Sequence, residues 1–200
     1  MTTDRIKAYY DSTEYREARS DLLLAIELVN EPKIAVDCGC GAGSDIEQLV
    51  RLGFKVYGYD VESESISRCR ERFKNNCDVV LSQDSFNTFR YPRASLVLAD
   101  ASLFFCSKDE FDFVWLKIYE SLYTGGIFCG SFVGPDDSMA CSNSVEDSIW
   151  PSNLVFHENE VKSLFTNYEI CRFTEHKLSG KTFEDEPHDW HIFSVVAKKD

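Results

Sequence analysis

Three glycines at alternate positions, Gly39, Gly41 and Gly43, constrain this chain more than any other feature. They follow a β-branched apolar run that ends in Asp37, and an amphipathic segment begins after them at Ser44. This order is typical of a strand, a tight turn and a helix. Because glycine has no Cβ, the backbone of such a turn can adopt positive φ and approach a ligand closely. The turn therefore predicts a site for a nucleotide-like ligand at the start of the helix.

The composition is that of a globular protein. The chain has 200 residues, of which 44% are hydrophobic and 14% aromatic, and this suits a single domain over residues 1–200. No apolar run approaches the ~20 residues of a membrane span, and residues 1–4 lack the basic and apolar regions of a signal peptide. We therefore expect a cytoplasmic protein with no membrane partner.

Charge and cysteine content argue against two classes of partner. The net charge of −13 is spread along the chain without a basic block, whereas nucleic-acid binding depends on clustered Lys and Arg. The eight cysteines form no Cys-x-x-Cys pair and are too few for a disulfide scaffold. We therefore expect buried reduced thiols, no nucleic-acid partner and no metal site.

Apolar periodicity predicts strands and helices that alternate along most of the chain. Residues 5–10 are expected to form a short tail before a helix over 14–29. Capping boxes at Ser44–Glu47 and Ser107–Glu110 predict the starts of two further helices. The predicted strands span residues 33–37, 55–60, 78–84, 94–100, 127–133, 169–177 and 190–198.

This alternation implies an α/β fold with a doubly wound, mainly parallel seven-stranded sheet of Rossmann-like type. The last two strands are joined by the polar turn 179–189 without a helix, so they are expected to pair antiparallel at the C-terminus. Residues 85–93 are too few for a full crossover helix. Residues 134–153 are rich in Gly, Pro, Ser, Asn and Asp, and a loop of this length usually covers a site.

Acidic residues follow or end four of the predicted strands: Asp37, Asp60, Asp84 and Asp100. Ligands of open α/β sheets bind at the carboxyl ends of the strands, so these side chains are expected near the ligand. A carboxylate accepts hydrogen bonds from vicinal hydroxyls or from an exocyclic amine. Four acids at these ends are more than a random scatter would give, and they indicate a ligand site at this edge of the sheet.

The glycine spacing separates two classes of cofactor. A dinucleotide fingerprint, Gly-x-Gly-x-x-Gly, started at Gly39 would place Ser44 where the third glycine belongs. The observed pattern, Asp37-x-Gly39-x-Gly41-x-Gly43, instead resembles motif I of the class I S-adenosylmethionine-dependent methyltransferases. A nicotinamide oxidoreductase stays an alternative only if this spacing misleads.

The resemblance implies S-adenosylmethionine as the cofactor and assigns roles by position. The glycines would line its methionine and ribose side, Asp60 would accept hydrogen bonds from both ribose hydroxyls, and Asp84 would accept one from the adenine amino group. The implied cofactor-binding residues are Asp37, Gly39, Cys40, Gly41, Gly43, Asp60, Val61, Asp84, Ser85 and Asp100.

Further segments resemble a group of small bacterial methyltransferases of the tellurite-resistance type: residues 100–106, 115–118, 125–134 and 190–199. The resemblance implies a tail and helix over 1–30, a cofactor-binding half over 31–100 and a substrate half over 101–200. The candidate catalytic residues are Asp100 and His191. The candidate acceptor-binding residues are Tyr10, Ser102, Phe104 and Phe105.

The expected reaction is the transfer of a methyl group from a sulfonium to a small-molecule acceptor by in-line displacement. Such a reaction needs mainly alignment and desolvation, so a general base is optional. The alternative is a non-catalytic module that binds S-adenosylmethionine or a partner. If Cys106, Cys129 or Cys141 faces the acceptor, a soft metalloid oxyanion could be captured after reduction. Either a monomer or a homodimer is expected.

Overall fold

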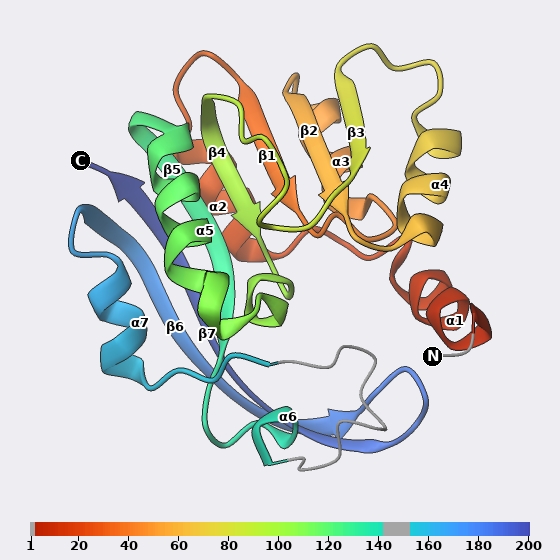
Figure 1. Cartoon of the computed structure of the whole chain (residues 1–200), viewed down its shortest axis with the longest axis vertical. Helices are drawn as coiled ribbons and strands as arrows, with labels where there is room; N and C mark the ends of the chain where they lie inside the picture. The colour runs from red at the N-terminus through yellow and green to blue at the C-terminus, as the bar shows by residue number, and fades with distance from the viewer. Residues whose placement is uncertain (1–2, 142–152) are drawn as a thin grey trace.

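A seven-stranded sheet with the order β3-β2-β1-β4-β5-β7-β6 runs through the molecule (Figure 1). The computed structural model describes residues 3–141 and 153–200. Strands β1 to β5 are parallel, and β7 pairs antiparallel with both β5 and β6, so the predicted fold class is confirmed. The strands are β1 (Ile34–Cys38), β2 (Lys55–Asp60), β3 (Val79–Gln83), β4 (Ala94–Ala99), β5 (Leu122–Val133), β6 (Tyr168–Lys181) and β7 (Pro187–Lys199).

Helices cover both faces of the sheet, which is why the central strand β4 is buried at every position. The helices are α1 (Thr3–Thr13), α2 (Ser20–Leu28), α3 (Ser44–Arg51), α4 (Ser63–Arg72), α5 (Lys108–Ser121) and α7 (Glu158–Leu164), with the short α6 (Ser138–Cys141) and the 3-10 helix η1 (Leu103–Phe105). Among the described residues, none of these helices combines the length and the apolar character that a membrane crossing requires.

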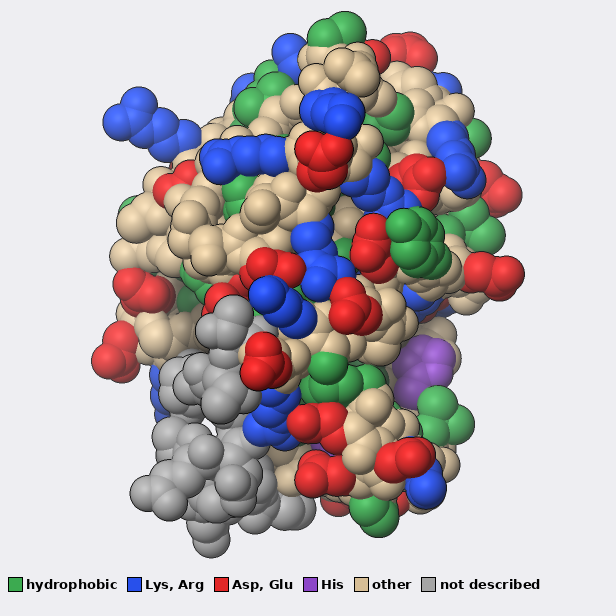
Figure 2. Space-filling view, turned by 90° about the vertical axis from the view of Figure 1, so that its right-hand side faces the viewer, with side chains coloured by type: hydrophobic (Ala, Val, Ile, Leu, Met, Phe, Trp, Pro, Cys, Tyr) green, Lys and Arg blue, Asp and Glu red, His purple; other side chains and the backbone are tan. Residues whose placement is uncertain are grey.

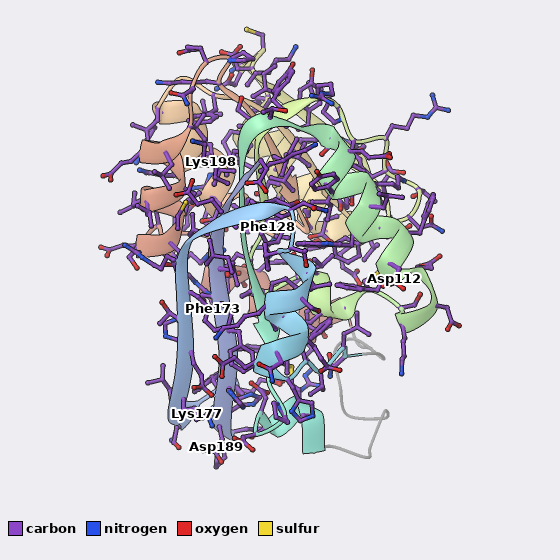
Figure 3. The ribbon with its side chains drawn as sticks, turned by 90° about the vertical axis from the view of Figure 1, so that its left-hand side faces the viewer. Asp112, Phe128, Phe173, Lys177, Asp189 and Lys198 are labelled. Carbon is purple, nitrogen blue, oxygen red and sulfur yellow. The ribbon has the colours of Figure 1, made fainter. Side chains whose placement is uncertain are left out.

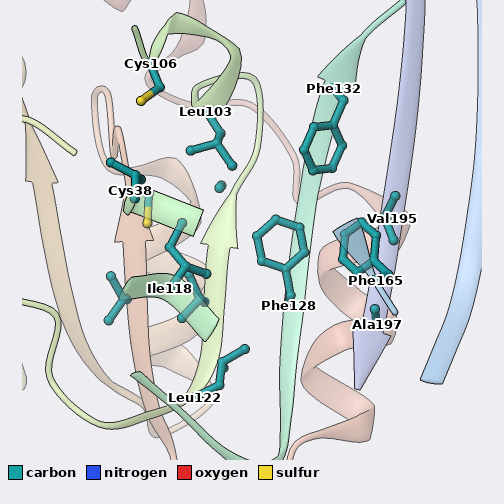
Figure 4. Close-up of a cluster of buried hydrophobic side chains, with 14 of the residues drawn as sticks. Cys38, Leu103, Cys106, Ile118, Leu122, Phe128, Phe132, Phe165, Val195 and Ala197 are labelled. Atoms are coloured by element: carbon teal, nitrogen blue, oxygen red, sulfur yellow. The ribbon is translucent and has the colours of Figure 1, made fainter. Parts of the chain in front are cut away.

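Two apolar clusters, one on each face, form the core. One cluster joins α2, α3 and α4 to the sheet through residues such as Leu22, Ile46 and Ile66. The other joins α5 and α7 to the opposite face, and Figure 4 shows Ile118 and Val195 near Phe128 in this cluster. Burial of these side chains, at roughly 25 cal/mol per Å² of apolar surface, is the main force that holds the layers together.

The N-terminal segment differs from its prediction. Residues 5–10 form part of helix α1 instead of a tail, and the predicted helix over 14–29 begins only at Ser20. Tertiary contacts explain both differences. Tyr10 of α1 is buried, and Arg16, in the link between α1 and α2, pairs with Asp45 of α3. Such contacts do not follow an apolar period, so the pattern could not indicate them.

The capping boxes also differ from their prediction. The N-cap of α3 is Gly43, and Ser44 lies inside the helix, where its Oγ accepts a hydrogen bond from Arg16 Nε at 3.2 Å. Ser107 does stand at the N-cap of α5, but its Oγ donates to the Glu110 carboxylate at 3.1 Å rather than bonding to the backbone. The helix starts near both positions are therefore confirmed, whereas the capping-box hydrogen bonds are wrong.

The C-terminal strands are longer than predicted. β6 and β7 continue to Lys181 and from Pro187, which reduces the predicted turn 179–189 to residues 182–186. Figure 3 shows the two strands side by side, with Lys198 at one end and Lys177 and Asp189 near the other. The pairing of β5 with β7 ends at Val133 and Ile192, so the outer part of this hairpin extends beyond the sheet.

Strand β5 begins at Leu122, five residues before its predicted start, and its pairing with β4 shifts register after Leu122. The predicted loop over 134–153 contains α6, and its residues 142–152 lie outside the described part of the chain. As predicted, the short connection over 85–93 has no helix.

Candidate functional site

A cavity of about 280 Å³ lies where β1, β2, β3 and β4 end, and α1 forms its outer wall. Six of the predicted cofactor residues line this first cavity, together with the predicted acceptor residues Tyr10, Ser102 and Phe105. The six are Gly39, Gly41, Asp60, Val61, Asp84 and Ser85.

The glycine turn lets the backbone approach neighbouring groups at the floor of the first cavity. Gly39 has φ +72°, and a Cβ at this position would stand 2.7 Å from the Cβ of Ser102. Gly41 has φ +52°, and the only atom near its would-be Cβ belongs to the Tyr10 ring, at 3.7 Å. Gly39 is therefore required for packing, whereas Gly41 leaves open space for a ligand.

Asp60 at the end of β2 is fixed by the backbone. Its Oδ2 accepts a hydrogen bond from the Gly41 N–H at 2.9 Å, and its Oδ1 accepts one from the Glu62 N–H at 3.0 Å. Burial raises the pKa of Asp60, and the two backbone hydrogen bonds oppose this shift. A carboxylate has about four lone-pair sites, so Asp60 still has acceptor capacity for two hydroxyl donors.

Asp84 stands one strand further along, just after β3. Its N–H donates to the Asp60 carbonyl oxygen at 3.1 Å, and its Oδ1 accepts a hydrogen bond from the Thr88 hydroxyl at 3.0 Å. Beside it, the Tyr59 and Phe86 rings meet edge to face at 6.0 Å, and both line the first cavity. The site thus combines carboxylates with aromatic walls, which suits a nucleoside. No motif points to Tyr59 or Phe86.

Three of the other predicted cofactor residues lie beneath the turn, outside the first cavity. A Cβ at Gly43 would stand 2.8 Å from the Phe73 ring, so this glycine serves helix packing. Cys40 is buried, and Asp37 is buried with its Oδ2 unpartnered among the described residues. Burial, reinforced by Asp45, raises the pKa of Asp37 well above its usual range.

Asp100, the last of the ten, takes part in an ion-pair cluster instead of lining either cavity described here. Its Oδ1 accepts hydrogen bonds from Arg19 Nη1 at 3.0 Å and from Ser131 Oγ at 3.1 Å, and Arg16 lies 3.6 Å from its Oδ2. Ser131 Oγ in turn accepts the N–H of Ala101 at 2.8 Å. These contacts hold Ala101 at φ +49°, an unusual conformation for a residue with a side chain.

A second cavity of about 600 Å³ lies beside the first. Phe104 and Phe105, two of the predicted acceptor residues, line it. Among the described residues, three line both cavities: Tyr9, Ala101 and Phe105. Residues of α1 and of the segment that follows β4 therefore form the boundary between the two cavities.

His191, a predicted catalytic candidate, lines neither cavity. It is buried, its Nδ1 accepts the Asp136 N–H at 3.1 Å, and its Nε2 lies 2.9 Å from a Glu175 oxygen. A Cβ at Gly134 would stand within 2.6 Å of the His191 ring, so glycine is required there. These contacts assign His191 to the packing between β5 and the hairpin.

Two of the three thiols considered for metalloid capture have raised pKa values, which disfavours their thiolate forms. Cys106 lines the first cavity, but burial and the nearby Glu110 raise its pKa to about 11. Burial also raises the pKa of Cys129 well above its usual range. The Cys141 side chain lies outside the described atoms. Within residues 3–141 and 153–200 no group of three His, Cys, Asp or Glu side chains is arranged to hold a metal ion.

A comparison with protein families agrees with the resemblance seen in the glycine turn. A family model described as a methyltransferase domain matches residues 35–126, from β1 into β5. Over this part, a little under half of the chain, the sequence is similar to methyltransferase domains. The match includes the glycine turn and the acids at or just after the ends of β2, β3 and β4. No curated protein matches the sequence of this chain.

Solved structures of methyltransferases share the fold of this chain. TehB from Haemophilus influenzae aligns with a TM-score of 0.76 at 19% identity, over 97% of this chain and 67% of that chain. A methyltransferase from Methanosarcina mazei aligns with a TM-score of 0.70 at 16% identity, over 92% and 99% of the two chains. The 1,6-didemethyltoxoflavin-N1-methyltransferase of Burkholderia thailandensis, with bound 1,6-didemethyltoxoflavin and S-adenosylhomocysteine, aligns with a TM-score of 0.65 at 16% identity, over 98% and 86%.

Proposed function

We propose that this protein transfers the methyl group of S-adenosylmethionine to a small-molecule acceptor by in-line displacement. One observation carries the proposal: the first cavity joins the glycine turn to Asp60 and Asp84, and it meets a second cavity of ligand size. A structural neighbour that holds both a small acceptor and S-adenosylhomocysteine supports the same arrangement.

The residues of the first cavity fit the cofactor. Asp60 would accept hydrogen bonds from the ribose hydroxyls, because two of its lone-pair sites remain after its backbone contacts. Asp84 would accept one from the adenine amino group, with the adenine against Val61 and Phe86. The methionine part would lie over Gly41, where no side chain blocks the backbone. When bound, the cofactor supplies an electrophilic methyl group.

The protein's contribution is alignment and the exclusion of water. Tyr9, Ala101 and Phe105 line both cavities and would surround the reacting atoms. Burial raises the pKa of the Tyr9 phenol, so at neutral pH this group keeps its proton and does not act as a base. Holding two reactants in line can account for about 7–11 kcal/mol of a barrier.

Calorimetry with S-adenosylmethionine and S-adenosylhomocysteine tests the cofactor assignment. Asp60→Ala is expected to weaken binding by about 1–3 kcal/mol, because hydrogen bonds to a buried carboxylate are lost. Asp112→Ala, an exposed acid on α5, is the matched control and is expected to bind like the wild type. If the wild type binds neither compound, the proposal is wrong, and tight binding without turnover of any acceptor would favour the non-catalytic alternative.

Three other expectations concern partners and location. Figure 2 shows acidic and basic side chains interspersed on the face that carries α1 and α4, and this supports the prediction that nucleic acid is not a partner. A cytoplasmic location and a monomeric or homodimeric state stay predictions.

A further inference from the structure

Five of the described residues that line the second cavity belong to the β6–β7 hairpin. Side chains alternate along a strand, so Trp190, Ile192 and Ser194 of β7 share one face, and all three line the cavity. Their partners in β6 include His176 and Leu178, which line it as well. Trp190 and Leu178 pair with each other beyond the end of β5, so the outer hairpin supplies an apolar floor.

The opposite wall is aromatic. Phe104 and Phe105 of η1 line the cavity, and their rings lie 4.5 Å apart. With Trp190 on the hairpin and Tyr9 of α1, four aromatic side chains line one space, and such rings favour planar ligands that stack on them or meet their edges.

The charged groups at the rim of this cavity are paired with each other or with neighbours. Arg19 donates to Asp100 at 3.0 Å, and Asp21 accepts from Arg172 at 3.0 Å. An acceptor that carries a strong charge would have to break one of these pairs or enter without a counter-ion, and both are costly. The cavity therefore favours a body that is largely apolar.

Among the described residues, the three that line both cavities offer no proton acceptor. Ala101 and Phe105 have no ionisable group, and Tyr9 keeps its proton at neutral pH. His176 lines the second cavity but not the first.

The geometry points to an acceptor class: planar aromatic compounds whose methyl-accepting atom is already unprotonated at neutral pH, as in an aromatic thiolate or a ring nitrogen. This inference rests on the proposed function. It adds that the outer hairpin, through Trp190 and Leu178, binds the aromatic body, and that none of the described residues lining both cavities removes a proton before transfer.

The step is balanced without a base. A lone pair of the acceptor forms a bond to the methyl carbon while the bond from that carbon to the sulfonium sulfur breaks, and its electron pair stays on sulfur. A thiolate then becomes a neutral thioether, and a neutral ring nitrogen becomes an N-methyl cation. In both cases the other product is neutral S-adenosylhomocysteine, and no proton moves.

Three probes distinguish the acceptor classes: 4-nitrothiophenol, which is a thiolate at neutral pH, quinoline with its ring nitrogen, and benzylamine, which is protonated. Each is incubated with the full chain and S-adenosylmethionine, and methylated product is measured by mass spectrometry. Turnover of 4-nitrothiophenol or quinoline, with none of benzylamine, is the expected result. Equal turnover of benzylamine would overturn the inference, because that amine must lose a proton.

Variants of the hairpin test whether it forms the apolar floor of the second cavity. Trp190→Ala is expected to raise the KM of an accepted probe about tenfold, since burial of an aromatic ring contributes more than the 1.4 kcal/mol that tenfold represents. Trp190→Phe keeps an aromatic ring and should therefore keep KM close to the wild-type value. Ile170→Ala, an exposed apolar residue at the other end of β6, is the control and should leave KM unchanged. An unchanged KM in Trp190→Ala would overturn the assignment.

Binding of S-adenosylhomocysteine distinguishes a failure of the inferred acceptor class from a failure of the proposed function. If the wild type and Trp190→Ala both bind this compound with similar Kd, the variant is folded and the cofactor site is intact. Retained binding with no turnover of either aromatic probe would then overturn the acceptor class alone. Loss of binding in the wild type would instead contradict the proposed function itself.

Discussion

Gly39 and Gly53 both have positive φ, but their surroundings differ. A comparison of alanine variants at the two positions therefore separates the cost of backbone strain from the cost of a close contact. Their φ values are +72° and +83°, but a Cβ at Gly39 would stand 2.7 Å from Ser102, whereas nothing lies within 4 Å of one at Gly53. Alanine at either position should cost about 1–2 kcal/mol through left-handed strain. Gly39→Ala is expected to cost more in urea unfolding, and equal losses would show that the close contact relaxes.

Asp37 gives the stability of the fold a pH dependence. Burial raises its pKa well above 3.8 in the folded protein, so the folded state holds this proton more tightly than the unfolded chain does. As the pH rises from ~4 through that raised pKa, the folded state loses stability. Asp37→Asn stays neutral, so its stability relative to the wild type should increase between about pH 4 and pH 7.

Urea unfolding at several pH values measures this difference. The exposed Asp112→Asn is the control, and its difference from the wild type should not change in the same way. A constant difference for Asp37→Asn across this range would contradict the raised pKa.

At the scale of elements, helix α1 connects two distant parts of the chain. Arg5 pairs with Glu184 in the hairpin turn at 2.5 Å, and Arg68 of α4 pairs with Asp11 at 2.7 Å. The first pair is about 30% exposed on both sides, and exposed pairs contribute about 0–1 kcal/mol. Arg5→Ala should therefore change Tm little while it increases local opening of the helix.

Amide hydrogen exchange measures that opening. Exchange in α1 should become faster in Arg5→Ala and stay unchanged in Lys7→Ala, which alters an exposed side chain of the same helix. Unchanged exchange in Arg5→Ala would show that other contacts of α1, such as the burial of Tyr10, are sufficient.

The elements that could be predicted are those whose signals are local. Strands β1 to β4 are apolar runs that end at or next to an acid, so their positions could be predicted, whereas their order in the sheet could not. Helix α1 has no such pattern, because its fixed position depends on Tyr10 and on ion pairs with residues far along the chain. The length of the hairpin was underestimated because its outer strands are exposed and polar, which is also typical of a turn.

At the scale of the whole molecule, cofactor binding should stabilise the entire fold. A ligand at 100 times its Kd adds about 2.7 kcal/mol to the free energy of unfolding. For a domain of this size that corresponds to a Tm increase of roughly 5–10 °C. A thermal shift measured with S-adenosylhomocysteine should show this increase, and Asp60→Ala should show a smaller one at the same concentration. An equal shift in that variant would place Asp60 outside the site.

The two cavities differ in how far the sequence could predict them. The first is built by residues next to a glycine motif and by acids at strand ends, and most of its predicted residues are brought together. The second depends on Leu178 and Trp190 of the hairpin and on Arg19, which lies more than 150 residues before them along the chain and shares no motif with them. Phe104 and Phe105, predicted to bind the acceptor, do line it, and the alternation of Trp190, Ile192 and Ser194 is a further signal that could have indicated it.

The hairpin that extends beyond β5 has a consequence for engineering. The cofactor side of the protein depends on β1 to β4, whereas the floor of the second cavity depends on the outer ends of β6 and β7, which make no pairs with β5. Leu178 and Trp190 can therefore be varied while β1 to β4 stay unchanged. A library restricted to these two positions is expected to change which ligands enter the second cavity.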